Sequence, residues 1–236
     1  MRVYEWTSSR ALARLHQNPS QTRAITPPGD YSDLRKRILR LPVDLYRGLR
    51  EMIELVTIAV DSTGIKVQKA GGGIERKHGK KKRYVKLHFV VRVESHEVVA
   101  MEISTDDTHD VKALPGLLDE AEGNVWVARL YGDDAYDSGK LYGFLESRVI
   151  EPVVKPRRNS RLDMRCPMRR RVVDQVRRLG YDGWARLTCY GRRWAVETAY
   201  SAFKRVFGEH SLARSFESIA RELVGKVALY NVLVNG

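Results

Sequence analysis

The sequence predicts an α/β protein in which a mixed β-sheet is flanked by helices. Apolar, β-branched runs of strand length recur along the middle of the 236-residue chain. Amphipathic stretches with the 3.6-residue period of a helix separate the later runs. The first three runs follow one another without an intervening helix, which favours an antiparallel meander. The later runs are joined through helices, which favours parallel pairing in the same sheet.

The strand-like runs begin at residue 56. Residues 56–60 (VTIAV) are continuously apolar, end at Asp61 and are typical of a buried central strand. Further strands are expected at 83–93, 97–105, 124–132 and 149–156. Helices are expected at 110–122, at 137–148 with Ser138 as N-cap, within 189–208 and at 216–234. This order of elements is that of the ribonuclease-H-like fold.

Two parts of the chain lie outside this alternation. Residues 1–55 predict a short helical N-terminal extension, because two amphipathic stretches are separated there by Pro42. Residues 155–193 contain 13 Lys or Arg and 3 Asp, a net charge of +10 within a chain of net charge +13. This composition predicts a basic insertion at 155–189, before the last helices. The ribonuclease-H-like domain is therefore expected over 56–236.

The charge of the whole chain indicates the class of partner. A net charge of +13 and a pI of about 9.9 favour binding to polyanions, of which nucleic acid is the first candidate. A membrane surface is disfavoured because the sequence has no signal peptide, no lipidation motif and no apolar run of about 18 residues. The two cysteines form no zinc-binding or disulfide pattern. We therefore expect a cytoplasmic, nucleoid-associated protein that does not bind membranes.

Two carboxylates follow strand-like runs. Asp61 and Asp133 come directly after the runs at 56–60 and 124–132. In an open α/β sheet, ligands bind at the edge formed by the carboxyl ends of the strands. If the two strands are neighbours, both carboxylates point into one crevice. The alternative is that each is an ordinary turn or cap residue. Asp134 competes with Asp133, since a one-residue shift would exchange them.

A third carboxylate comes from the stretch near the C-terminus. At about 100° per residue, Tyr190, Arg193, Glu197 and Lys204 fall within an arc of roughly 60° on a helix. The alternative is a solvated face with i, i+4 charge pairs. Three converging carboxylates repel one another, and Mg²⁺ or Mn²⁺ would relieve that repulsion. Two such ions could activate a water or a 3′-hydroxyl for displacement at phosphorus.

Three sequence blocks carry a family resemblance. They are VDSTGIKV with Asp61, YGDDAYDS with Asp133, and the spacing Tyr-(2)-Arg-(3)-Glu-(6)-Lys, which Tyr190, Arg193, Glu197 and Lys204 satisfy in full. In these blocks the chain resembles the DDE-class transposases of insertion sequences, in the insertion-sequence-four/five superfamily. The resemblance covers about residues 56–234.

The resemblance implies a ribonuclease-H-like catalytic core that cleaves and joins double-stranded DNA at element ends with Mg²⁺ (or Mn²⁺). Asp61, Asp133 and Glu197 would be the metal ligands and catalytic residues. Arg193 and Lys204 would contact the DNA backbone, and Tyr190 would position a strand near the scissile phosphate. Joining two ends implies a homodimer or a larger assembly. The family usually carries a longer N-terminal region than the 60 residues that precede Asp61.

Further DNA contacts are expected from basic clusters. Lys80, Lys81 and Lys82 lie in one cluster, and Arg169, Arg170 and Arg171 lie in the basic insertion. Trp184 could hold a flipped base, as the resemblance implies, or could pack in the core. Two alternative functions stay open: a nuclease of the same fold that cuts without joining, and a catalytically silent, transposase-derived DNA-binding protein.

Overall fold

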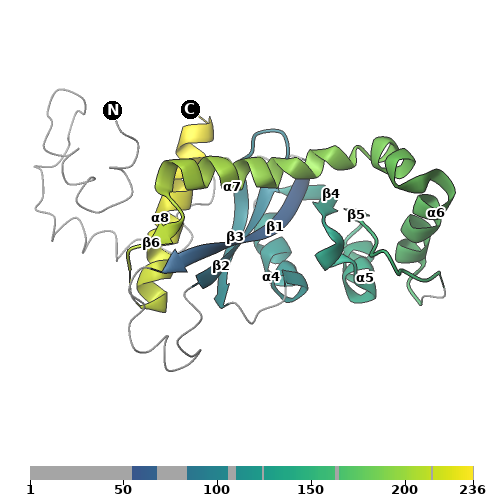
Figure 1. Ribbon diagram of the computed structural model, residues 1–236, viewed down its shortest axis with the longest axis horizontal. Helices are drawn as coiled ribbons and strands as arrows, with labels where there is room; N and C mark the ends of the chain where they lie inside the picture. The colour runs from purple at the N-terminus through teal and green to yellow at the C-terminus, as the bar shows by residue number, and fades with distance from the viewer. Residues whose placement is uncertain are drawn as a thin grey trace, which may run out of the picture.

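The computed structural model describes residues 55–67, 84–105, 110–123, 125–162, 165–213 and 215–235. Within these ranges the chain forms one mixed sheet with helices on its faces and at one end (Figure 1). The strands are β1 Leu55–Val67, β2 Tyr84–Arg92, β3 Val98–Thr105, β4 Trp126–Gly132, β5 Glu151–Val154 and β6 His210–Ser211. The helices are α4 Asp110–Glu122, α5 Gly139–Ser147, α6 Pro167–Leu187, α7 Trp194–Phe207 and α8 Phe216–Asn235, with 3₁₀ turns η2 Asp134–Tyr136 and η3 Tyr190–Arg193.

The strand order confirms the predicted mixed sheet. The order is β3-β2-β1-β4-β5, and β6 pairs with the end of β1. β1 pairs antiparallel with β2 and parallel with β4, and β4 pairs parallel with β5. The two strands that lead to Asp61 and Asp133 are therefore neighbours, as the crevice prediction required.

Successive side chains of β2 show which helices cover the two faces of the sheet. Phe89 stacks on Tyr200 of α7, with ring centroids 4.5 Å apart. The preceding residue, His88, points to the opposite face because side chains alternate along a strand. Its ring lies 3.6 Å from a carboxylate oxygen of Asp110, the first residue of α4. α7 and α4 therefore pack on opposite faces, and α7 runs across the sheet in Figure 1.

Two predicted boundaries are wrong. β1 does not end at Asp61 but continues to Val67, because Ile65 and Val67 are buried and this part of the strand still pairs with β2. The predicted helix around Tyr190 is interrupted: Cys189 has a left-handed φ of 53° and a 3₁₀ turn follows before α7 begins at Trp194. The remaining predicted strands and helices agree with the structure within a few residues.

The basic insertion is mainly helical. α6 fills most of it and lies at the end of the molecule beside α5 (Figure 1). Gly180 bends α6 with a φ of 69° and a ψ of 166°, a conformation that favours glycine. The predicted N-terminal helices lie outside the described residues. Among the described residues, no helix has the length and apolar character needed to cross a membrane.

Candidate active site

The structure brings the three predicted acids into one region from three separate elements. Asp61 lies in β1, Asp133 directly follows β4, and Glu197 lies in the first turn of α7. Arg193, just before α7, joins them. Its guanidinium donates to Glu197 at 2.5 Å and lies 3.8 Å from a carboxylate oxygen of Asp61. Because 15% of the Arg193 side chain is exposed, this charge acts in a partly desolvated setting.

The environment of Asp61 disfavours its negative charge. Burial is the main cause of a rise in its pKa to about 6, and the carboxylates of Asp133 and Glu197 act in the same direction. The backbone amide of Ser62, which donates at 2.7 Å, and the guanidinium of Arg193 oppose this shift. A nearby cation would therefore stabilise the charged form of Asp61.

Asp133 occupies a turn rather than a strand. Its side chain accepts a hydrogen bond from the Ala135 amide at 2.9 Å and so caps η2. Burial raises its pKa, as do Asp134 and Asp110, whereas the Ala135 amide and Arg193 lower it. Asp134 is exposed, and it is Asp133 whose charge acts on Asp61. Of the two competing carboxylates, Asp133 is therefore the more buried.

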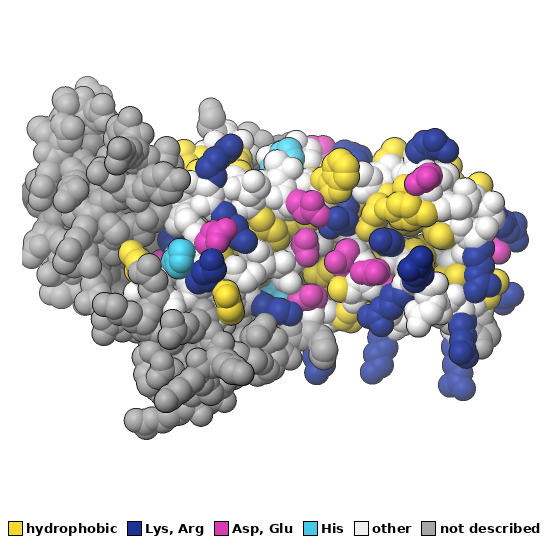
Figure 2. Space-filling view, in the orientation of Figure 1, with side chains coloured by type: hydrophobic (Ala, Val, Ile, Leu, Met, Phe, Trp, Pro, Cys, Tyr) yellow, Lys and Arg dark blue, Asp and Glu magenta, His cyan; other side chains and the backbone are white. Residues whose placement is uncertain are grey.

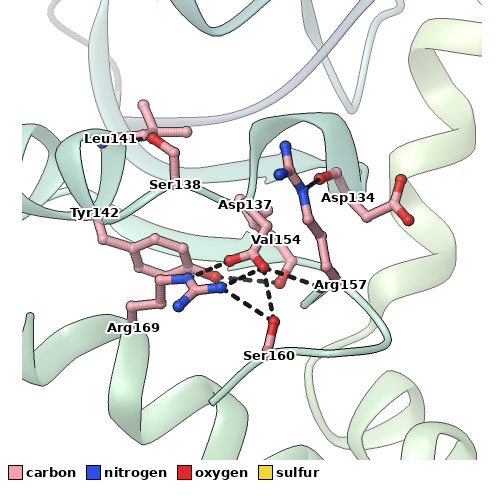
Figure 3. A network of polar contacts seen from close by, with 9 residues as sticks. All are labelled: Asp134, Asp137, Ser138, Leu141, Tyr142, Val154, Arg157, Ser160 and Arg169. Atoms are coloured by element: carbon pink, nitrogen blue, oxygen red, sulfur yellow. Dashed lines mark hydrogen bonds and ion pairs between the residues drawn. The ribbon is translucent and has the colours of Figure 1, made fainter. Parts of the chain in front are cut away.

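A polar network fixes the turn that carries Asp133 (Figure 3). Asp137 ends this turn and its side chain is fully buried. Arg169 of α6 donates to both carboxylate oxygens of Asp137, at 2.5 and 2.6 Å. The Arg157 amide and the Ser160 hydroxyl also donate to Asp137, each at 2.9 Å. Burial raises the pKa of Asp137, but these donors outweigh burial and hold it below its ordinary value.

A pocket of about 420 Å³ opens beside the second acid. Its lining includes Asp133, Asp134, Arg193, Tyr181 and Trp194. Lys155 also lines the pocket, with its ammonium 5.4 Å from the centre of the Tyr181 ring. Carboxylates, cations and exposed aromatic rings thus share one hollow, which suits a ligand that has both phosphate and ring systems.

The comparison with protein families agrees with this arrangement. The sequence matches the family described as "Transposase DDE domain" over residues 54–232. This chain belongs to the DDE transposase family. Among solved structures, it is similar to a chain in the cryoEM structure of a simian T-cell lymphotropic virus intasome in complex with PP2A regulatory subunit B56 gamma. That match has a TM-score of 0.31 and 12% identity, over 81% of this chain and 68% of the other, and adds nothing to the family assignment.

Two predicted DNA contacts of this DDE transposase domain lie away from the surface. Trp184 is 1% exposed and packs on Tyr190 with ring centroids 5.0 Å apart, which favours the core alternative over a base-binding role. Arg169 is buried and paired with Asp137, so its charge is already neutralised. The sequence did not predict that these two side chains are buried, because α6 has few buried residues within a strongly basic segment. The described buried residues of α6 are Arg169, Val172, Val173 and Trp184.

The other predicted contacts differ in their placement. Arg170 and Arg171 are exposed on α6, as a DNA contact requires. Lys204 lies two turns beyond Glu197 on α7, about 10 Å along the helix axis. Tyr190 is buried, and its hydroxyl donates to the backbone carbonyl of Gly132 at 3.1 Å. Lys80, Lys81 and Lys82 lie outside the described residues.

Two residues near the acids were not predicted to belong to the site. Asp110 raises the pKa of Asp133, and the Lys86 ammonium donates to a carboxylate oxygen of Asp110 at 3.2 Å. Tyr136 is buried, and its pKa is raised well above its ordinary value by burial and by the charges of Asp110, Asp61 and Asp133. From the sequence, Asp110 is predicted only to begin a helix. The packing of α4 against β2, β4 and η2 brings it near the acids.

Proposed function

We propose that this protein is a metal-dependent DDE transposase of the insertion-sequence-four/five superfamily, with a ribonuclease-H-like core. In this proposal it cleaves double-stranded DNA at the ends of an insertion sequence and transfers the 3′-hydroxyl ends to target DNA. The observation that carries it is the convergence of Asp61, Asp133 and Glu197 from three elements of a chain in the DDE transposase family.

The donor set suits Mg²⁺ or Mn²⁺. Hard divalent cations prefer carboxylate oxygens, and a cation would favour the charged forms of Asp61 and Asp133, whose pKa values are raised. Among the described residues, no three His, Cys, Asp or Glu side chains already stand close enough to hold an ion. Asp61, Asp133 and Glu197 would hold the metal, which would supply activation of the attacking oxygen and stabilisation of the leaving oxygen. Arg193 supports the acids by holding positive charge between two of them.

The DNA would run from the acids toward α6. Figure 2 shows acidic side chains near the middle of the face viewed, and Lys and Arg side chains over the part of the molecule formed by α6. Arg170 and Arg171 are exposed there. Such guanidinium groups suit phosphate contacts, which carry affinity without sequence information. A homodimer or larger assembly would join two ends in one reaction.

The decisive experiment removes each acid in turn. Asp61→Asn, Asp133→Asn and Glu197→Gln are compared with the wild type on labelled oligonucleotide and supercoiled DNA with Mg²⁺ or Mn²⁺. We expect each substitution to abolish cleavage and strand transfer while DNA binding persists, because each removes a charged metal ligand and leaves the basic surface intact. Asp134→Asn distinguishes the two neighbouring carboxylates, and because Asp134 is exposed this variant should keep more activity than Asp133→Asn.

The outcomes separate the possible functions. Cleavage without joining would indicate a nuclease of the same fold. Binding without any cleavage by the wild type would indicate a DNA-binding protein and refute the proposal. If Asp134→Asn is inactive and Asp133→Asn is active, the second acid is Asp134.

A further inference from the structure

Two buried tyrosine hydroxyls reach the backbone beside the first two acids. Tyr200 lies on α7, about one turn after Glu197, and its hydroxyl lies 2.8 Å from the carbonyl oxygen of Asp61 and 2.8 Å from that of Leu87. A single phenolic hydrogen is shared between these two acceptors. The ring stacks on Phe89, which is directly opposite Asp61 in the register of β1 and β2. Tyr200 thus joins the third acid's helix to the backbone of the first acid.

Tyr190 makes the equivalent contact on the side of the second acid. Its hydroxyl donates at 3.1 Å to the carbonyl of Gly132, the residue just before Asp133. The ring is held between aromatic neighbours: Trp184 at 5.0 Å and Tyr181 at 6.3 Å between ring centroids. Tyr190 also precedes Arg193 by three residues, so η3 links the cation of the site to the strand that ends just before the second acid.

We infer that Tyr190 and Tyr200 are positioning residues, which hold the backbone beside Asp133 and Asp61 in register with the segment that bears Arg193 and Glu197. This inference rests on the proposed function and names residues that support the same site. Neither hydroxyl touches the reacting atoms.

The physical case lies in how strictly a metal site depends on the placement of its ligands. The acids come from β1, from the turn after β4 and from α7, so their separation depends on how α7 and η3 sit on the sheet. A hydrogen bond to a backbone carbonyl beside an acid directly fixes the position of α7 or η3 on the sheet. Groups that orient metal ligands from behind typically account for 10–100-fold in metal affinity or activity.

The chain offers a matched control. Tyr230 of α8 is also buried and donates from its hydroxyl to a backbone carbonyl, that of His96, at 3.0 Å. His96 lies between β2 and β3, and neither Tyr230 nor His96 contacts an acid of the site among the interactions described. Tyr→Phe at 190, 200 and 230 removes one hydroxyl in each case. The loss of stability should therefore be similar in all three variants.

The test measures Mn²⁺ binding by titration calorimetry on the full chain without DNA, together with kcat and KM for cleavage and the melting temperature. Tyr200→Phe and Tyr190→Phe should each weaken Mn²⁺ binding and lower kcat by about 10-fold or more, with KM for DNA unchanged. Tyr230→Phe should change neither the Mn²⁺ affinity nor kcat by more than about 2-fold, since its bond lies elsewhere. The three melting temperatures should fall by similar amounts.

The result that overturns the inference is equal Mn²⁺ affinity and equal kcat in all three variants, with wild-type binding and cleavage intact. That result leaves the proposed function standing and makes the two hydroxyls ordinary core hydrogen bonds. A wild-type chain that neither binds Mn²⁺ nor cleaves DNA overturns the proposed function and the positioning role together.

Discussion

The first and second acids are held in different ways. Asp61 lies inside β1, with β2 on one side and β4 on the other, so the hydrogen-bond ladders of the sheet fix its backbone. Asp133 lies past the end of β4, in a turn whose position depends on a few side chains around Asp137. A ladder distributes its stability over many bonds, whereas a buried ionic contact concentrates it in one pair. The position of Asp133 should therefore be far more sensitive than that of Asp61 to single substitutions outside the site.

The largest effect should come from breaking the buried ion pair on the second side. Arg169→Met leaves the buried carboxylate of Asp137 without its bidentate partner, and we expect a loss of about 3–5 kcal/mol in the free energy of unfolding. Urea denaturation measures it. Arg170→Met is the control, because the next residue is exposed and should cost less than about 0.5 kcal/mol.

A second substitution sharpens this prediction. The double variant Arg169→Met with Asp137→Leu removes both charges together and should recover much of the lost stability, because no unpaired charge remains buried. If Arg169→Met alone is as stable as Arg170→Met, the turn of the second acid does not depend on this pair and the contrast with β1 fails.

The second prediction concerns the first side. The folded-state pKa of Asp61 is about 6, above its ordinary value of 3.8, so the folded chain binds a proton more tightly than the unfolded chain. Its contribution to stability is full below pH 4 and is lost as the pH rises through about 6. Asp61→Asn should therefore stabilise the metal-free chain above pH 6, by up to about 3 kcal/mol.

Urea denaturation in EDTA at pH 5 and pH 8 measures this effect. Asp61→Asn should raise the free energy of unfolding more at pH 8 than at pH 5, because the wild-type carboxylate is charged only at the higher pH. Thr57→Ser, on the same strand but away from the acids, should show no pH-dependent gain. If Asp61→Asn has the same free energy of unfolding as the wild type at both pH values, the charge of Asp61 does not destabilise the folded chain.

The same contrast explains what the sequence could predict. Strands and helices with a clear apolar period, such as β2 and α8, agree with the structure because local burial decides them. The three acids could be predicted as site residues because each follows or lies on such an element. β1 was predicted too short because Ser62, Thr63 and Gly64 resemble a turn, whereas pairing with β2 keeps them in the strand.

The rest required contacts between distant parts of the chain. Asp137 and Arg169 are 32 residues apart, and no local pattern indicates that they pair. The same holds for Tyr200 and Asp61, which are 139 residues apart. Cys189 interrupts the helix in a left-handed conformation without being glycine, so the sequence carries no breaker signal at that position.

The smallest effect should come from a single cap on the second side. Ser138 accepts a hydrogen bond from the Leu141 amide at 3.2 Å and so caps α5, one residue after Asp137. Ser138→Ala should cost about 1 kcal/mol in the free energy of unfolding, since one amide at the start of the helix loses its acceptor. Ser147→Ala, at the exposed end of the same helix, is the control and should cost less than about 0.5 kcal/mol.

This cap also tests how closely the second side is coupled. Ser138 adjoins Asp137. The losses in the free energy of unfolding caused by Ser138→Ala and Arg169→Met should therefore add only if the cap and the ion pair act independently. In a double-mutant cycle we expect a coupling energy of about 0.5 kcal/mol or more, as for residues that share one network. Strict additivity would mean that the cap of α5 and the ion pair act independently, so that the cap does not help to fix the turn of Asp133.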